Sequence, residues 1–236
     1  MAEVLEAVAE KYGPAAGAIA ADYYDELREG AKASGRFAPA VAALPEAERF
    51  KSLAGWGAGP LFGAEPDSAL ALSRMSGGLS RIVQNVGRDT ITDAVVSDPA
   101  GPTYARHASA NACAFCAMLA TRGPVYAPGN ATRVTGERLG GTDYRKMRRT
   151  GISREQILAG SRAKTVAQGG RKGRATSQAL GEKYHDDCHC TVVPVFPGQT
   201  YREAPYVKKW RDAYAGSPSN DTKDILSSMR EQLGTN

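Results

Sequence analysis

Apolar side chains recur at helical spacing through the first hundred residues. Their positions in residues 2–12 predict a short helix, because one helical face repeats every three to four residues. We expect Gly13 and Pro14 to end it, since proline suits the start of a helix better than its interior. A second helix is predicted over 14–34. Its apolar stripe consists of Ala18, Ile19, Tyr23, Leu27 and Ala31.

Further along, a short helix is predicted over 45–54, because Pro45 suits a first helical position. The glycine-rich residues 55–60 predict a loop. Three large apolar side chains are expected to anchor that loop to the core: Trp56, Leu61 and Phe62.

The longest apolar stripe predicts one helix from about Asp67 to Val96. At a rise of 1.5 Å per residue, that helix is about 45 Å long. Asp98 precedes Pro99 and is expected to end it, because the residue before a proline disfavours helical backbone. Packing in a small helical bundle is the simplest role for this apolar face.

The pattern changes in the second half of the chain. The β-branched run over 191–196 predicts a strand. An amphipathic segment over 206–214 follows, and a last helix is predicted from about Asp221. Its apolar stripe is expected to pack on its own domain or on a partner. That stripe consists of Ile225, Leu226, Met229 and Leu233.

Charge is distributed unevenly. The 236 residues carry a net charge of +5, but residues 133–183 hold thirteen basic side chains and four acidic ones, a net charge of +9. Such a segment can contact nucleic-acid phosphate without reading sequence, although a solvated loop has the same composition. The basic run over 169–174 has no interleaved aromatic residue, which argues against a base-stacking groove. The candidate nucleic-acid contacts are Arg145, Lys146, Arg148, Arg149, Arg171, Lys172 and Arg174.

No run of about 18 apolar residues is present, so we expect no transmembrane helix and no membrane partner. The N-terminus lacks the apolar core of a secretory signal, so we expect synthesis in a reducing cytoplasm.

All four cysteines lie in two close pairs. Cys113 and Cys116 form a Cys-x-x-Cys motif. After 68 intervening residues the pattern His185-x-x-Cys188-x-Cys190 begins. In a reducing compartment such pairs are typical of metal ligands rather than of disulfides. Four thiolate or imidazole ligands around one ion are typical of structural zinc. The ligands are predicted to be the four cysteines, or three of them with His185.

A metal ion would close the long polar segment between the pairs, and its binding energy would then stabilise the fold. Three alternatives remain: disulfides in an extracellular particle, a cysteine nucleophile with His185 or His189 as its base, and a catalytic metal with Asp186 or Asp187 as base. A nucleophile leaves three cysteines unexplained, and a catalytic metal needs an open coordination position. We assign His107 no role.

The segments Asn111–Tyr126 and Tyr184–Cys190 resemble the Mu F-like minor capsid proteins of tailed phages, in particular the branch found in phages of actinobacteria. The pattern of that family is a Cys-x-x-Cys, a variable insert and a His-x-x-Cys-x-Cys ending. Its positions are occupied here by Cys113, Cys116, His185, Cys188 and Cys190. The helical front is similar as well, at 11–13, 23–28 and 35–37.

The resemblance implies a minor head (head morphogenesis) protein of the virion, made in the host cytoplasm. It would associate with the portal protein or the major capsid protein and aid head assembly, DNA packaging or ejection. Members of this branch are often labelled capsid maturation proteases, so a prohead protease acting on scaffold or capsid precursor is the alternative. We find no Gly-x-Ser-x-Gly or His-Glu-x-x-His motif and assign no catalytic residue.

These observations predict an α+β protein in three parts. Residues 1–98 form a mainly helical region that docks on portal or capsid. Residues 99–197 form a small α/β domain stapled by Zn²⁺, with the basic segment as an insert. Residues 198–236 form a helical tail.

Overall fold

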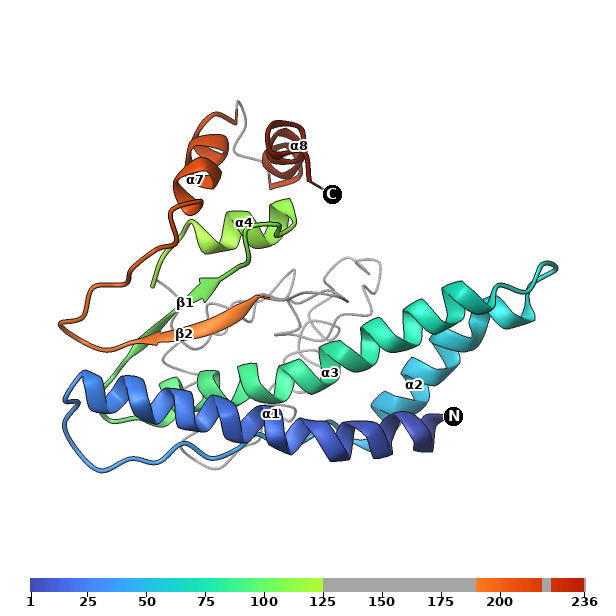
Figure 1. The fold of residues 1–236 in the computed structure, drawn as a ribbon, viewed down its shortest axis with the longest axis horizontal. Coiled ribbons are helices and arrows are strands. Elements are labelled where there is room, and N and C mark those ends of the chain that lie inside the picture. Colours follow the sequence, from blue (N-terminus) through green and yellow to red (C-terminus); the bar gives the residue numbers. More distant parts are fainter. Residues whose placement is uncertain (125–189, 218–221, 236) are drawn as a thin grey trace, which may run out of the picture. The chain divides into compact units, whose positions relative to one another are not determined.

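The computed structural model describes residues 1–124, 190–217 and 222–235. These residues are mainly helical with one small two-stranded sheet, which agrees with the α+β class (Figure 1).

The described chain divides into two compact units. The first, the helical unit, contains residues 1–32 and 36–94. The second, the sheet unit, contains 33–35 and the described residues from 95 onward. The three-part division expected from the sequence stays a prediction.

The first helix, α1, spans Ala2–Gly30 without interruption, so the predicted break at Gly13 and Pro14 is wrong. Pro14 removes one backbone N–H donor, but tertiary packing holds the helix together through this turn. Gly13 and Gly17 are both buried, and a Cβ added to them would lie 2.8 and 2.4 Å from a neighbouring side chain. The absence of a Cβ therefore lets other segments pack directly against the α1 backbone.

The buried face of α1 differs from the predicted one. It consists of Leu5, Ala9, Gly13, Gly17, Ala20 and Tyr24. Of the predicted stripe, Ile19 is 70% exposed and Tyr23 is 37% exposed. The prediction was wrong because α1 carries two adjacent stripes at helical spacing, and the small-residue stripe permits the closer approach.

Helix α2 spans Ala47–Ala58 and continues into the 3₁₀ turn η1, Gly59–Phe62, so most of the predicted loop is helical. The predicted anchoring of Trp56 and Phe62 is also wrong, since they are 49% and 84% exposed. Gly57 makes the close contact instead, because a Cβ there would lie 2.3 Å from Met75.

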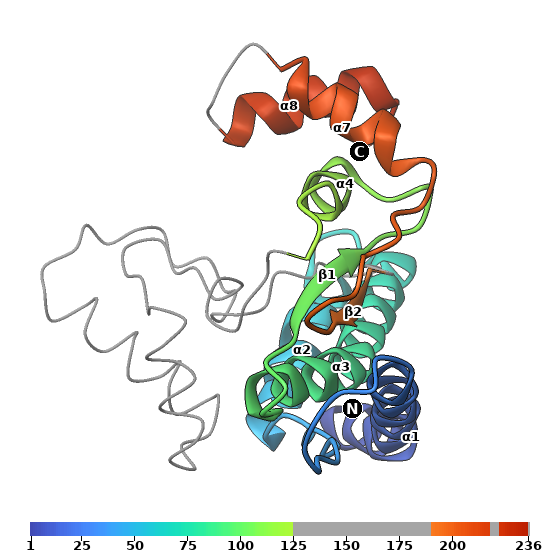
Figure 2. The same ribbon diagram turned by 90° about the vertical axis from the view of Figure 1, so that its left-hand side faces the viewer.

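Helix α3 spans Ser68–Ser97 and confirms the long predicted helix. The Asp67 carboxylate accepts a hydrogen bond from the Leu70 N–H at 2.8 Å, which satisfies a donor at the start of the helix. Two α3 glycines allow close approach: a Cβ on Gly78 would lie 2.3 Å from Leu53, and one on Gly87 would lie 3.1 Å from a carbonyl of α1. Helices α1 and α3 accordingly run side by side (Figures 1 and 2).

The core of the helical unit joins all three helices. Its buried cluster consists of Leu5, Ala9, Phe50, Leu53 and Ile82. Thr90 adds a polar tie to this packing. Its hydroxyl donates to the Val86 carbonyl at 2.7 Å and accepts from the Ala42 N–H at 3.0 Å, which fixes the segment between α1 and α2 onto α3.

The sheet unit begins with strand β1, Thr103–His107, which pairs antiparallel with β2, Thr191–Val195. The prediction of β2 is confirmed, whereas β1 was not predicted. The three central residues of β1 are all buried, so it lacks the polar–apolar alternation of a half-exposed strand. Pro194 lies opposite Tyr104. In a two-stranded sheet each strand has an unpaired edge, and proline is tolerated where its missing N–H faces that edge.

The described residues of the sheet unit also form three helices: α4 (Ala114–Ala120), α7 (Val207–Ala215) and α8 (Thr222–Leu233). Helices α7 and α8 pack on each other and on α4 (Figures 1 and 2). Ile225 and Met229 of α8 are buried, so the predicted stripe of the last helix packs within its own unit. Helix α4 was not predicted.

Candidate metal centre

The fold brings three of the four cysteines toward one end of the sheet. His107, the last residue of β1, pairs with Thr191, the first residue of β2. Cys190 directly precedes β2, and the turn that leaves β1 runs into α4, which begins after Cys113. Antiparallel pairing therefore places the two segments that carry these cysteines at the same end, although they are far apart in the sequence.

Helix α4 organises the first cysteine pair. Cys113 is its N-cap residue, with extended backbone and a partly exposed side chain. Cys116 lies three positions later in the first turn and is buried, with 3% of its surface exposed. Residues three apart on a helix share a face, so the side chains of Cys113 and Cys116 project from neighbouring positions on that face.

Cys190 completes the described part of the candidate site. It is 4% exposed, and none of the three described cysteines is in a disulfide. Cysteine thiolates are common ligands of zinc. Within residues 1–124, 190–217 and 222–235, however, no three Cys, His, Asp or Glu side chains lie close enough to hold an ion by themselves. His185 and Cys188 lie outside the described residues, so the ligand set stays a prediction.

One hydrogen bond from the tail supports the turn that carries the cysteine pair, and sequence reasoning assigned no role to the tyrosine that makes it. The Tyr206 hydroxyl donates a hydrogen bond to the Ala108 carbonyl at 2.7 Å, one residue beyond β1. The Tyr206 ring packs against Trp210 with centroids 4.8 Å apart, and Trp210 is buried. The amphipathic pattern over 206–214 was the available signal. It indicated an apolar face but not the carbonyl that Tyr206 binds.

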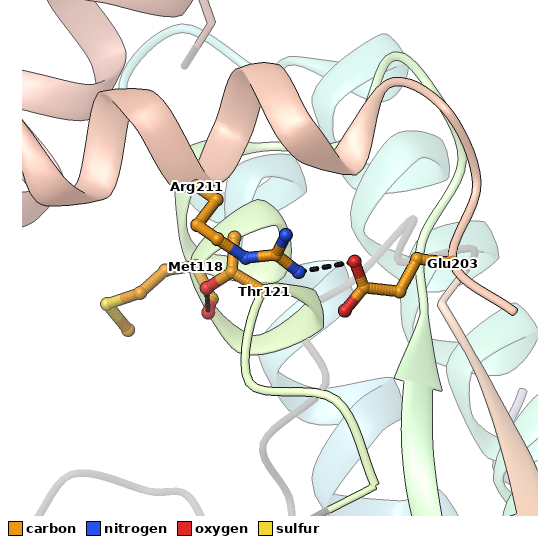
Figure 3. Close-up of polar contacts among 4 residues, drawn as sticks. All are labelled: Met118, Thr121, Glu203 and Arg211. Atoms are coloured by element: carbon orange, nitrogen blue, oxygen red, sulfur yellow. Dashed lines mark hydrogen bonds and ion pairs between the residues drawn. The ribbon is translucent and has the colours of Figure 1, made fainter. Parts of the chain in front are cut away.

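The far end of α4 is bordered by polar contacts (Figure 3). The Thr121 hydroxyl donates to the Met118 carbonyl at 2.8 Å, which satisfies an acceptor at the end of the helix. Arg211 of α7 forms an ion pair with Glu203, which lies between β2 and α7. The first contact lies within the C-terminal turn of α4, and the second ties α7 to the segment that precedes it.

Ser109 lies two positions from His107, and neither residue is assigned a role. The Ser109 hydroxyl donates a hydrogen bond to the Asn111 side chain at 2.8 Å. The candidate bases Asp186, Asp187 and His189 lie outside the described residues, as do all seven candidate nucleic-acid contacts. DNA binding therefore stays a prediction.

A family match covers most of the chain. Residues 1–141 and 163–217 match the family described as VG15 protein. The chain belongs to the VG15 protein family. Membership indicates a phage protein. Neither a curated protein nor a solved structure matches this VG15 protein. Among the helices in its described residues, none has the length and apolar content needed to cross a lipid bilayer.

Proposed function

We propose that this VG15 phage protein is a minor head protein of the Mu F-like type, associated with the portal or the inner capsid. In this proposal Cys113, Cys116 and Cys190, together with Cys188 or His185, hold a structural zinc ion. The basic segment over 133–183 contacts packaged DNA through phosphate.

The observation that carries the zinc proposal is the convergence of the two cysteine-bearing segments at one end of the β1–β2 sheet. Cys116 and Cys190 are both buried and Cys113 is partly exposed, which is compatible with a closed four-ligand site near the surface. In this proposal the three described cysteines and one further ligand from the second motif would fill a tetrahedral shell. The described side chains do not form such a group by themselves, so metal binding would have to draw them together.

The head-protein proposal is supported by the full cysteine–histidine pattern combined with membership in a phage protein family. A closed site of this kind stabilises a fold rather than performing catalysis, which favours the structural role over the prohead protease. The protease remains the alternative outcome of the test below.

The zinc proposal is tested by elemental analysis of the purified full chain, with thiol titration before and after chelation. We expect about one zinc ion per chain and four thiols that react fully only after chelation. The Cys116→Ser variant should lose the metal, whereas Ser109→Ala should keep it. A metal-free, folded wild-type chain would overturn the proposal.

The head role is tested by mass spectrometry of purified phage particles. We expect peptides of this chain in particles, and a capsid subunit that has the same N-terminus whether or not the gene is disrupted. Absence from particles would overturn the head role. Loss of capsid processing in the disrupted phage, restored by the wild-type gene, would establish the protease instead.

A further inference from the structure

Helix α1 carries a second apolar stripe that the helical unit leaves exposed. This outer stripe consists of Val4, Val8, Tyr12, Ala15, Ile19 and Tyr23. Five of its six members directly precede a buried residue of α1 in the sequence. The outer stripe therefore lies about 100° from the buried face around the helix axis. From Val4 to Tyr23 it extends about 28 Å along the helix.

Three large members of the outer stripe face solvent, and Val8 is half-buried. Val4 is 64% exposed, Tyr12 is 52% exposed and Ile19 is 70% exposed. Scattered apolar residues are normal on a protein surface, but an aligned series over several helical turns is typical of an interaction site. Tyr23, at the far end, is partly covered. Desolvation by this partial burial raises the pKa of its hydroxyl above the ordinary value.

Charge around the outer stripe indicates what kind of partner fits. Helix α1 has seven acidic and two basic side chains, a net charge of −5. Four carboxylates gather at the Tyr23 end, and all four are exposed: Asp22, Asp25, Glu26 and Glu29. Pairing α1 with α1 of a second copy would bring like charges together, in either direction. A partner with basic residues would instead gain attraction at that end.

We infer that the outer stripe of α1 docks an amphipathic helix of another protein, with lysine or arginine residues flanking its apolar face. The stripe supplies apolar positions at helix-packing spacing, and the carboxylates around Tyr23 orient the basic end of the partner. The inference does not rest on the zinc site or on the head role, because both the stripe and the charge belong to α1 alone.

The test uses the full chain and a synthetic helical peptide of leucine and lysine, with leucine at i, i+3 and i+4 spacing. Binding is measured by fluorescence anisotropy at about 0.15 M salt. We expect saturable one-to-one binding that Ile19→Asp weakens by about tenfold or more, because it places a charge in the apolar contact. Ala18→Asp, an exposed neighbour with the same added charge, should change the affinity by less than about threefold.

Charge is tested separately. The double variant Asp22→Lys, Glu26→Lys should bind the leucine–lysine peptide about tenfold more weakly than the wild type does. A matched leucine–glutamate peptide should bind the wild type at least about tenfold more weakly than the leucine–lysine peptide does. Circular dichroism checks that each variant keeps its helices. Equal binding of both peptides, or equal effects of Ile19→Asp and Ala18→Asp, would overturn the inference. So would a concentration-dependent dimer in sedimentation that Ile19→Asp abolishes, because the occupant would then be a second copy.

Discussion

The helical unit and the sheet unit differ in the contacts that stabilise each of them internally. In the helical unit, α1, α2 and α3 follow one another along the chain, and glycines let their backbones approach closely. In the sheet unit, β1 and β2 pair although residues 108–190 separate them. Closing so long a segment costs chain entropy that two short strands repay poorly. We therefore expect packing alone to maintain the first unit, and we expect a metal ion to add most to the stability of the second.

The largest expected effect comes from removing the metal. If zinc joins the two cysteine segments, chelation should unfold the sheet unit and leave the helical unit folded. Structural zinc contributes about 10–16 kcal/mol in small domains, so the effect should exceed that of any single substitution below. Hydrogen exchange measured by mass spectrometry should show lost protection in β1, β2 and α4, with protection retained at Leu53 and Ile82 of the helical core.

Re-addition of zinc should restore that protection, and chelator added to the Cys116→Ser variant should change nothing further. Equal loss of protection in both units would contradict the contrast between them. Unchanged protection in both would mean that packing suffices for the sheet unit as well.

A smaller effect is expected from adding one methyl group between helices. Gly78→Ala would place a Cβ 2.3 Å from the buried Leu53, so we expect about 1–3 kcal/mol of destabilisation in the helical unit. Gly55→Ala in α2 is the matched control. It meets no atom within 4 Å and should stabilise by about 0.5–1 kcal/mol through helix propensity. Urea unfolding followed by circular dichroism measures both, and effects of the same sign would show that the helices do not pack this closely.

The smallest effect is expected from one tie in the sheet unit. Tyr206→Phe removes the hydroxyl that binds the Ala108 carbonyl, and we expect a loss of about 0.5–1.5 kcal/mol. Because Ala108 adjoins the turn leading to Cys113, zinc should also dissociate faster under chelator. Lys209→Ala, an exposed change on the same helix, is the control. Unaltered stability and zinc release in Tyr206→Phe would show that this contact does not support the turn.

The long helix α3, strand β2 and the two tail helices could be predicted because their signals are local. Each has enough apolar positions at one period, and Asp98 with Pro99 marks the end of α3. The continuity of α1 through Pro14 could not be predicted, because proline is locally unfavourable there and only packing at Gly13 and Gly17 compensates. Strand β1 and helix α4 are short and uniformly buried, so neither has a clear period.

The sequence by itself identified the cysteine and histidine residues of the candidate site, because each group of candidate ligands has a short and recognisable spacing in the sequence. It also determined that apolar side chains recur at helical spacing in residues 2–12 and 14–34. Only the tertiary structure decided which stripe is buried, because the choice depends on how closely α1 and α3 approach each other at Gly17 of α1 and Gly87 of α3. Only the tertiary structure placed Cys190 at the end of the sheet from which the chain turns toward Cys113, because strand register joins residues that are distant in sequence.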